Sequence, residues 1–301
     1  MSELFPDFET RRVATSGAEI HCVIGGSGPP LLLLHGFPQT HAIWHKIAPQ
    51  LAQRYTVVAP DLRGYGDSAK PASDAQHLTY SKRALALDQV EVMRALGFEH
   101  FLVAGHDRGG RVAHRLALDH PRCVERLALL DIAPTKHMYE HTTQEWATLY
   151  YHWFFLIQPF DLPERLIGAD PDFYLMKKLG AWGTREPPFA PAALAEYRRC
   201  FREPAAIHAM CEDYRAGASI DLEHDAADVA AGRKIGCPLL VLWGERGVVH
   251  RCFDPLLAWQ EVALEVRGEA LPGGHYLAEE LPELTLDRLQ TFFDEGAAAT
   301  R

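Results

Sequence analysis

The sequence lacks the features that mark several large classes of protein. It has no block of Lys and Arg residues and a formal net charge of −10 at pH 7, so we expect neither nucleic acid nor a membrane surface as a partner. No apolar run approaches the roughly 20 residues that span a bilayer. Residues 1–12 are acidic and lack an apolar core, so the sequence predicts neither a transmembrane helix nor a secretion signal.

Cysteine is also scarce and lacks the spacings that carry chemistry. The six cysteines form no CxxC pair and show no zinc-ligand pattern, so we expect reduced thiols that pack as small apolar residues. A reducing cytoplasm is the compartment that fits them best. The sequence contains neither a metal-ligand cluster nor a dinucleotide-binding fingerprint, which predicts that no metal and no organic cofactor is needed.

Short apolar runs that favour β-strands alternate with stretches of helical periodicity. Hydrophobic residues make up 48% of the 301 residues, which is sufficient for a large buried core. The alternation is typical of a mostly parallel sheet whose strands are joined by crossover helices. Strands are predicted at residues 19–24, 30–34, 55–60, 101–104, 124–130, 238–243 and 263–266, and two of the helices at residues 39–53 and 82–96.

The alternation stops in the middle of the chain and later resumes. Residues 134–217 are rich in aromatic, proline and charged residues, and the strand pattern returns at Cys237. We therefore predict an inserted helical cap domain at residues 134–217. The core domain would then consist of residues 1–133 and 218–301, with the cap inserted between two strands of one sheet.

A strand-to-turn-to-helix pattern suggests a catalytic nucleophile. The apolar strand at residues 101–104 leads into Gly105-His-Asp-Arg-Gly109 and then into a helical stretch. This is the G-x-S-x-G nucleophile elbow of the α/β-hydrolase fold, with Asp107 in place of serine, and it implies a mostly parallel, eight-stranded sheet flanked by helices. The two glycines leave space for a strained turn. Asp107 could instead only cap the helix, but further active-site residues favour a nucleophile.

An aspartate nucleophile suits a different reaction from a serine. A serine that attacks a saturated carbon would leave a stable ether, whereas a carboxylate leaves an ester that water can cleave. Because aspartate has a reference pKa of about 3.9, Asp107 needs no base for the first step. We therefore expect attack on an sp³ carbon and a base that acts only in the second step.

The base and its orienting acid are expected after later strands. His275 lies in Leu-Pro-Gly-Gly-His-Tyr, at the place where this fold carries its catalytic histidine. Residues 244–249 offer glycine where an aspartate is often found, so we predict that Asp131, at the end of the strand at residues 124–130, orients the histidine. Glu245 is the alternative acid, and Asp131 could be an ordinary turn residue.

Two backbone N–H groups are predicted to form an oxyanion hole. Residues 35–38, His-Gly-Phe-Pro, follow a strand and resemble the turn that donates one N–H in this fold. Phe37 would supply that donor, and Arg108, next to the nucleophile, would supply the other. The alternative is a tight turn without a catalytic role.

Two arginines at the start of the helix after Asp107 predict an anionic substrate. Arg108 and Arg111 lie where the helix dipole disfavours positive charge, so an anion should compensate them. Arginine binds carboxylates bidentately, and a small acid held in this way would present its α-carbon to Asp107. The alternative is pairing with carboxylates of the protein itself.

The chain resembles the fluoroacetate dehalogenases, a branch of the haloacid-cleaving α/β hydrolases. The resemblance covers nearly the whole chain and rests on Gly105-His-Asp-Arg-Gly-Gly-Arg111, Asp131, His152-Trp153, Tyr214 and His275. It implies hydrolysis of a 2-haloacid, such as fluoroacetate, to a hydroxyacid and halide. A homodimer is expected from the family alone.

The resemblance also implies roles for individual residues. Arg108 and Arg111 would bind the substrate carboxylate, and Trp182 would line the pocket. The halide would be hydrogen-bonded by His152, Trp153 and Tyr214. Without the resemblance, His152 and Trp153 could equally be part of the core of the cap.

Three other functions remain open at this stage. An epoxide hydrolase shares the aspartate nucleophile and would use two cap tyrosines, Tyr214 together with Tyr150, Tyr151 or Tyr174. A haloalkane dehalogenase would give the arginines no anion to bind. A non-catalytic binding protein of the same fold would not need nucleophile, acid and base together.

Overall fold

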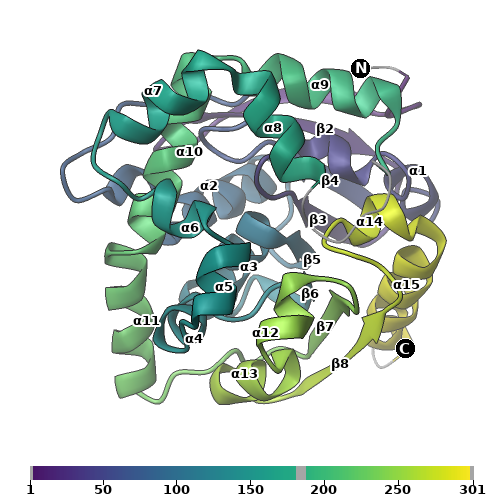
Figure 1. The fold of residues 1–301 in the computed structure, drawn as a ribbon. Coiled ribbons are helices and arrows are strands. Elements are labelled where there is room, and N and C mark those ends of the chain that lie inside the picture. Colours follow the sequence, from purple (N-terminus) through teal and green to yellow (C-terminus); the bar gives the residue numbers. More distant parts are fainter. Residues whose placement is uncertain (1–2, 181–187, 299–301) are drawn as a thin grey trace.

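The computed structural model describes residues 3–180 and 188–298, which fold around one eight-stranded sheet (Figure 1). The strand order is β1-β2-β4-β3-β5-β6-β7-β8. The strands β1 and β2 pair antiparallel, as do β2 and β4, and all other neighbours are parallel. The strands are β1 (Glu9–Ala14), β2 (Glu19–Gly25), β3 (Pro30–Leu34), β4 (Thr56–Pro60), β5 (Phe101–His106), β6 (Val124–Leu130), β7 (Leu239–Gly244) and β8 (Val266–Leu271). The predicted mostly parallel, eight-stranded sheet is confirmed.

The two edge strands were not correctly predicted. The strand β1 was missed because its sequence is polar and largely exposed, which leaves no apolar alternation. The last strand was predicted at residues 263–266, but β8 runs from Val266 to Leu271. An edge strand buries little surface, so the apolar residues that precede β8 gave the stronger signal.

The region between β3 and β4 also differs from its prediction. Residues 39–53 were predicted to form one helix, but they form a short 3₁₀ helix, η1 (His41–Trp44), and a one-turn helix, α1 (Ala48–Leu51). Pro49 lacks the N–H that a continuous helix would need at this point, so it can only stand at the start of a new helix. The helix predicted at residues 82–96 is present as α2 (Lys82–Ala95).

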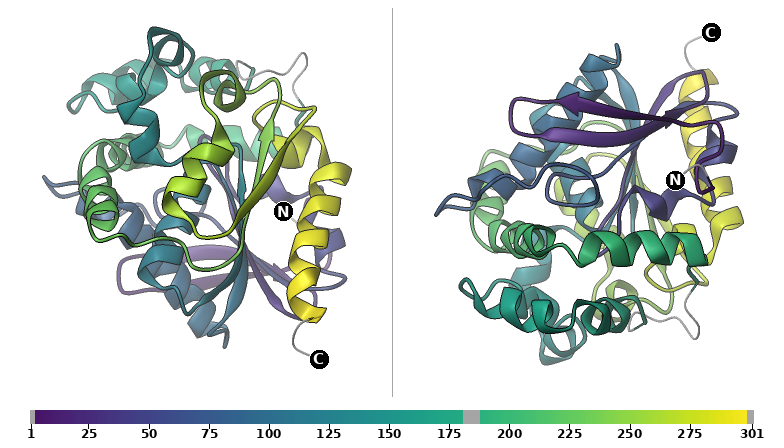
Figure 2. Two further views of the ribbon diagram at one scale, coloured as in Figure 1. Left: turned by 90° about the horizontal axis from the view of Figure 1, so that it is seen from below. Right: turned by 90° about the horizontal axis from the view of Figure 1, so that it is seen from above.

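Helices cover both faces of the sheet. Side chains alternate along β3, so Leu31 and Leu33 pack with α15 (Pro282–Ala298), while Leu32 and Leu34 pack in the core that includes α2 and α3 (Asp107–Asp119). Figure 2 shows α15 on one side of the sheet, away from the inserted helices. The remaining short elements are η2 (Leu78–Tyr80), α12 (Val248–Cys252), α13 (Pro255–Val262) and α14 (Leu277–Glu280).

Only helices lie between β6 and β7 among the described residues, in the region where the composition changes. These helices are α4 (Thr135–Glu140), α5 (Gln144–Leu149), α6 (His152–Phe155), α7 (Leu162–Ala169), α8 (Pro171–Gly180), α9 (Pro191–Phe201), α10 (Pro204–Gly217) and α11 (Ile220–Ala230). The helix α11 follows the predicted cap boundary and packs against α4 and α10.

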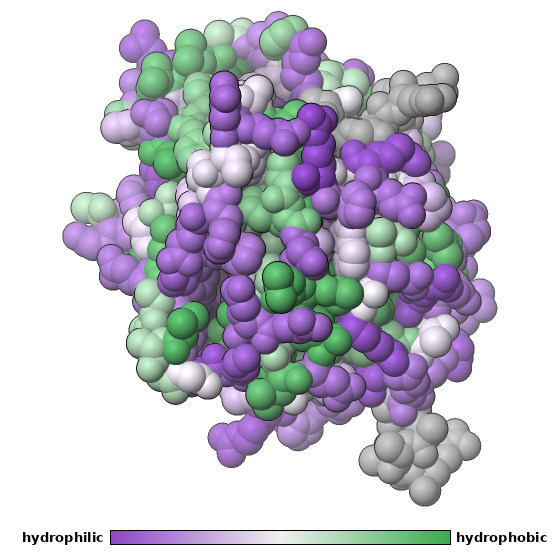
Figure 3. Space-filling view, turned by 60° about the horizontal axis from the view of Figure 1, so that its bottom comes forward, coloured by the Kyte–Doolittle hydropathy of each residue, from purple (hydrophilic) through white to green (hydrophobic). Residues whose placement is uncertain are grey.

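The face of the molecule shown in Figure 3 is mainly polar. Figure 3 shows hydrophilic residues over most of one face, with hydrophobic residues gathered in small patches. Within the part of the chain that the structure describes, no helix has the length and apolar character needed to cross a bilayer. All six cysteines are free, and four of them are buried.

Candidate active site

The nucleophile elbow is a strained turn between β5 and α3. Asp107 begins α3 with φ of 47°, in the left-handed region that non-glycine residues rarely adopt. A Cβ atom on Gly105 would lie 2.7 Å from the Cα atom of Gly110. A Cβ atom on Gly109 would lie 2.2 Å from the backbone oxygen of His35. Both glycines of the predicted motif are therefore required by backbone contacts.

We expect Gly109→Ala to destabilise the protein by at least about 3 kcal/mol, because the new methyl group would meet backbone that cannot move aside. Gly168→Ala is the matched control, since nothing lies within 4 Å of a Cβ atom at this exposed position in α7. There alanine should stabilise the helix by up to about 1 kcal/mol. Denaturant unfolding of both variants measures the difference, and equal stabilities would contradict this account of the elbow.

The structure brings His275 and Asp131 into direct contact. The Nδ1 atom of His275 lies 2.6 Å from Oδ2 of Asp131, and the other carboxylate oxygen accepts a hydrogen bond of 3.0 Å from the backbone N–H of Gly244. Both side chains are buried. Glu245, the alternative acid, is exposed. A Cβ atom on Gly247 would lie 3.1 Å from the Asp131 carboxylate, so the glycine in this loop leaves space for that carboxylate.

Two residues that the sequence analysis missed fix the backbone around His275. The carboxylate of Glu280 accepts hydrogen bonds of 2.7 and 2.8 Å from the backbone N–H groups of Gly274 and Tyr276. The Nε2 atom of His106 lies 2.9 Å from the backbone oxygen of His275. His106 precedes Asp107, so this contact ties the elbow to the histidine loop. The sequence shows an acidic residue near a helix start but not which N–H groups it binds.

The backbone N–H of Phe37 donates a hydrogen bond of 2.8 Å to Oδ1 of Asp107. Arg108 is the second residue of α3, and its N–H belongs to the first turn, where N–H groups have no acceptor within the helix. Burial opposes ionisation of Asp107, but its electrostatic interactions with His275, His106, Arg111 and Arg108 keep its pKa below the usual value. The nucleophile position therefore holds a buried carboxylate that is ionised at neutral pH.

Arg108 extends from α3 to α10 and is paired with a carboxylate of the protein. Its Nε atom lies 2.7 Å from Oδ2 of Asp213, and its Nη2 atom donates a 2.7 Å hydrogen bond to the backbone oxygen of the same residue. The guanidinium lies over the ring of Tyr214, 4.1 Å from its centroid. Burial would lower the pKa of Arg108, but Asp213 raises it well above its usual value. Asp213 was missed because the sequence does not show which of many acidic residues faces the arginine.

Arg111 has a different environment. Its guanidinium donates to the backbone oxygen of Ala133 at 3.0 Å and to Oγ1 of Thr135 at 2.9 Å, and it lies over the Trp153 ring at 4.6 Å. Its Nε atom has no hydrogen-bond partner among the described residues. Burial and the nearby Arg108 lower the pKa of Arg111 to about 10, so it is charged at neutral pH. Within the described ranges, no carboxylate forms an ion pair with this buried cation.

Two of the three predicted halide ligands pack against the Phe37 ring, and the third packs against Tyr214. His152 stacks on the Phe37 ring with ring centroids 5.8 Å apart, and Tyr214 packs edge-on at 5.3 Å. Trp153 lies 6.1 Å from Tyr214, and all three side chains are buried. Neither Nε1 of Trp153 nor the hydroxyl of Tyr214 has a hydrogen-bond partner in the parts of the chain described here. Trp182, the predicted pocket residue, lies outside the described residues.

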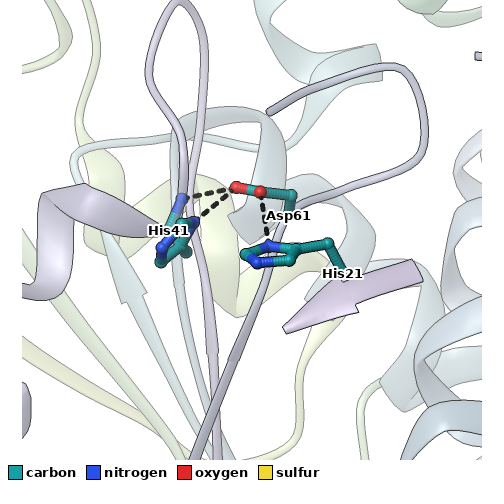
Figure 4. Close-up of side chains that lie close together, drawn as sticks. All are labelled: His21, His41 and Asp61. Carbon is teal, nitrogen blue, oxygen red and sulfur yellow. Dashed lines mark hydrogen bonds and ion pairs between the residues drawn. The ribbon is translucent and has the colours of Figure 1, made fainter. Parts of the chain in front are cut away.

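A second buried polar cluster contains His21, His41 and Asp61 (Figure 4). By distance these side chains could hold a metal ion. However, one Asp61 oxygen accepts from the backbone N–H and the Nδ1 of His41, at 2.9 and 2.8 Å. The other accepts from Nδ1 of His21 at 2.9 Å and the backbone N–H of Asp67 at 3.0 Å. Both ring nitrogens therefore act as donors to a carboxylate, which makes the cluster a hydrogen-bonded network.

The chain is similar to known proteins over nearly its whole length. The family model of the alpha/beta hydrolase fold matches residues 29–247. A fluoroacetate dehalogenase from Burkholderia sp. is 49% identical, with 97% of this chain and 96% of that protein covered. A soluble epoxide hydrolase from Corynebacterium sp. (strain C12) is 37% identical, with 92% of this chain and 94% of that protein covered. A crystal structure of a proposed alpha/beta hydrolase from Nostoc sp. PCC 7120 matches with a TM-score of 0.94 and 61% identity, over 96% of this chain and 99% of that one. The fold, the elbow and these relatives agree: the chain belongs to the α/β-hydrolase family.

Proposed function

We propose that this protein hydrolyses small 2-haloacids, with fluoroacetate converted to glycolate and fluoride through an ester on Asp107. The observation that carries the proposal is the buried Arg111 cation, which has no ion-pair partner among the described residues and lies one turn into the helix that begins at Asp107. A substrate carboxylate would supply the missing negative charge. The 49% identity to a fluoroacetate dehalogenase supports the same assignment.

In the first step, a carboxylate oxygen of Asp107 attacks the α-carbon of the haloacid. A carbon–oxygen bond forms, the carbon–halogen bond breaks, and the halide leaves with the electron pair. Arg108 and Arg111 hold the substrate carboxylate so that the α-carbon faces Asp107. No proton is transferred in this step, because the nucleophile is already ionised.

The leaving halide requires hydrogen-bond donors, fluoride most of all, because it is a poor leaving group and a strong acceptor. His152, Trp153 and Tyr214 supply ring N–H and O–H groups in a buried environment. The Trp153 and Tyr214 donors, which have no partner among the described residues, support this role, because buried polar groups are costly unless a ligand or another group binds them.

In the second step, water cleaves the ester. Asp131 holds Nδ1 of His275, so Nε2 is the nitrogen that takes a proton from water. The hydroxide attacks the carbonyl carbon of the Asp107 ester, and the N–H groups of Phe37 and Arg108 stabilise the oxyanion. Glycolate departs and the Asp107 carboxylate is restored. As the bond to the glycolyl oxygen breaks, His275 gives that oxygen the proton it took from water, and the new carboxylic acid of Asp107 loses its proton to solvent.

Epoxide hydrolysis is the second candidate function. Tyr150 and Tyr214 are both buried in the inserted region: the Tyr150 ring lies 6.4 Å from that of His275, and the Tyr214 ring lies 5.3 Å from that of Phe37, whose N–H binds Asp107. Tyr151 is 44% exposed and therefore less suited to act inside the site. An epoxide, however, would leave the Arg111 cation without a negative partner, so we favour the haloacid.

The test compares fluoroacetate, chloroacetate and styrene oxide as substrates of the purified protein. We expect halide and glycolate from the haloacids, measured with ion-selective electrodes and chromatography, and little or no diol from the epoxide. If styrene oxide gives a diol and neither haloacid releases halide, the protein is instead an epoxide hydrolase. The relative rates of the two haloacids measure the halogen preference.

A further inference from the structure

Arg108 belongs to a buried network of charges that lies behind the proposed substrate site. Asp213 is shared between Arg108 and Lys82, whose Nζ atom contacts its other oxygen. The hydroxyl of Tyr65 donates a 2.8 Å hydrogen bond to Asp213. Lys82 also lies 3.5 Å from Oδ2 of Asp221. All of these side chains are buried, so solvent screens them weakly.

The network contains equal numbers of positive and negative charges. Arg108 and Lys82 are the cations, and Asp213 and Asp221 are the anions. Burial would raise the pKa of Asp213, but the two cations hold it well below its usual value, so it is ionised at neutral pH. Arg108 therefore adds no uncompensated charge to the site. It still contributes hydrogen bonds, because only two of its five N–H groups are used by Asp213.

We propose that Asp213 is a specificity-determining residue, which restricts the site to substrates with a single negative charge. With Arg108 compensated by Asp213, Arg111 is left to balance one substrate carboxylate. A second negative charge on the ligand would be buried near the Asp107 carboxylate with no second uncompensated guanidinium to pair with it, which is strongly unfavourable. The proposal rests on the proposed function for the identity of the anion. It adds that haloacids with a second carboxylate are excluded by charge.

Two ligands of nearly the same shape isolate this effect. Oxalate is a dianion at neutral pH, and oxamate replaces one of its carboxylates with a neutral amide. Calorimetric titration of the intact protein with each gives a ratio of dissociation constants that depends mainly on the second charge. We expect the wild-type protein to bind oxamate at least about tenfold more tightly than oxalate.

Asp213→Asn should reverse much of this preference, because it leaves Arg108 as a second uncompensated cation. We expect the ratio to shift toward oxalate by at least about tenfold. Asp221→Asn is the matched control: it makes the same change of charge in the same network, but on the carboxylate that contacts Lys82 and not Arg108. Its ratio should change by less than about threefold.

Several results would overturn the proposal. A folded Asp213→Asn protein with an unchanged ratio would do so, as would an equal shift in the Asp221→Asn control. The wild-type protein provides a test that needs no substitution, because equal affinity for the two ligands, or no binding of oxamate, contradicts the proposal directly. Titration needs no turnover, so an oxamate preference without halide release would reject the dehalogenase function and leave the charge restriction standing.

Discussion

Asp107→Asn is expected to abolish halide release from fluoroacetate and chloroacetate, with a loss in kcat of about 10⁴-fold or more. The amide is a poor nucleophile toward saturated carbon, so the first carbon–oxygen bond does not form. Asparagine is the suitable replacement, because it tolerates the left-handed φ of 47° better than alanine does. Thermal unfolding of the variant shows whether the elbow stays intact. Halide release at a rate near that of the wild-type protein would exclude Asp107 as the nucleophile.

Asp107→Ser is the informative companion variant. It creates the Ser-His-Asp combination that many α/β hydrolases use for esters. Attack on a haloacid would then produce an ether, which His275 and water cannot cleave, so we expect no sustained turnover. Continued turnover by this variant would show that the chemistry does not pass through an ester on residue 107.

The sequence was sufficient to predict the centre of the fold. Strands β3 to β7 are buried and apolar, so their hydrophobic runs stand out, and the elbow has a fixed spacing of glycines around Asp107. The edge strands β1 and β8 bury only part of their surface, so their sequences carry a weaker signal. Local sequence therefore predicts an element best where both of its faces are buried.

The site was predictable only where a residue has a fixed place in a motif. Asp107 and His275 were singled out as candidates by their positions after strands. Asp213 and Glu280 were not, because each acts by meeting a distant part of the chain: Asp213 pairs with Arg108 across the boundary between core and insertion, and Glu280 binds the N–H groups beside His275. Such contacts depend on tertiary packing, which a single sequence does not reveal.

His275→Gln is expected to stop the reaction after one turnover. Because attack by the Asp107 carboxylate transfers no proton, and Arg111 and Arg108 still lower its pKa in this variant, the first step should still occur and release about one equivalent of halide per active site. Without a base the ester is not hydrolysed, so Asp107 should retain a carboxymethyl group. Rapid-quench measurement of halide and mass spectrometry of the peptide that contains Asp107 test both parts. His100→Gln is the matched control, because His100 is exposed and far in sequence from His275. This variant should release halide at the wild-type rate.

Each alternative result has a distinct meaning. Absence of any halide burst in His275→Gln would show that the histidine also assists the first step, which contradicts an independent, ionised nucleophile. Steady turnover would show that another group activates water. Asp131→Asn should be a milder form of His275→Gln, because the ring would lose the charged partner of its Nδ1 atom but its loop would remain held by the backbone contacts of Glu280 and His106. We expect its steady-state rate to fall by about 10²- to 10⁴-fold with the halide burst preserved, since only ester hydrolysis depends on an oriented base.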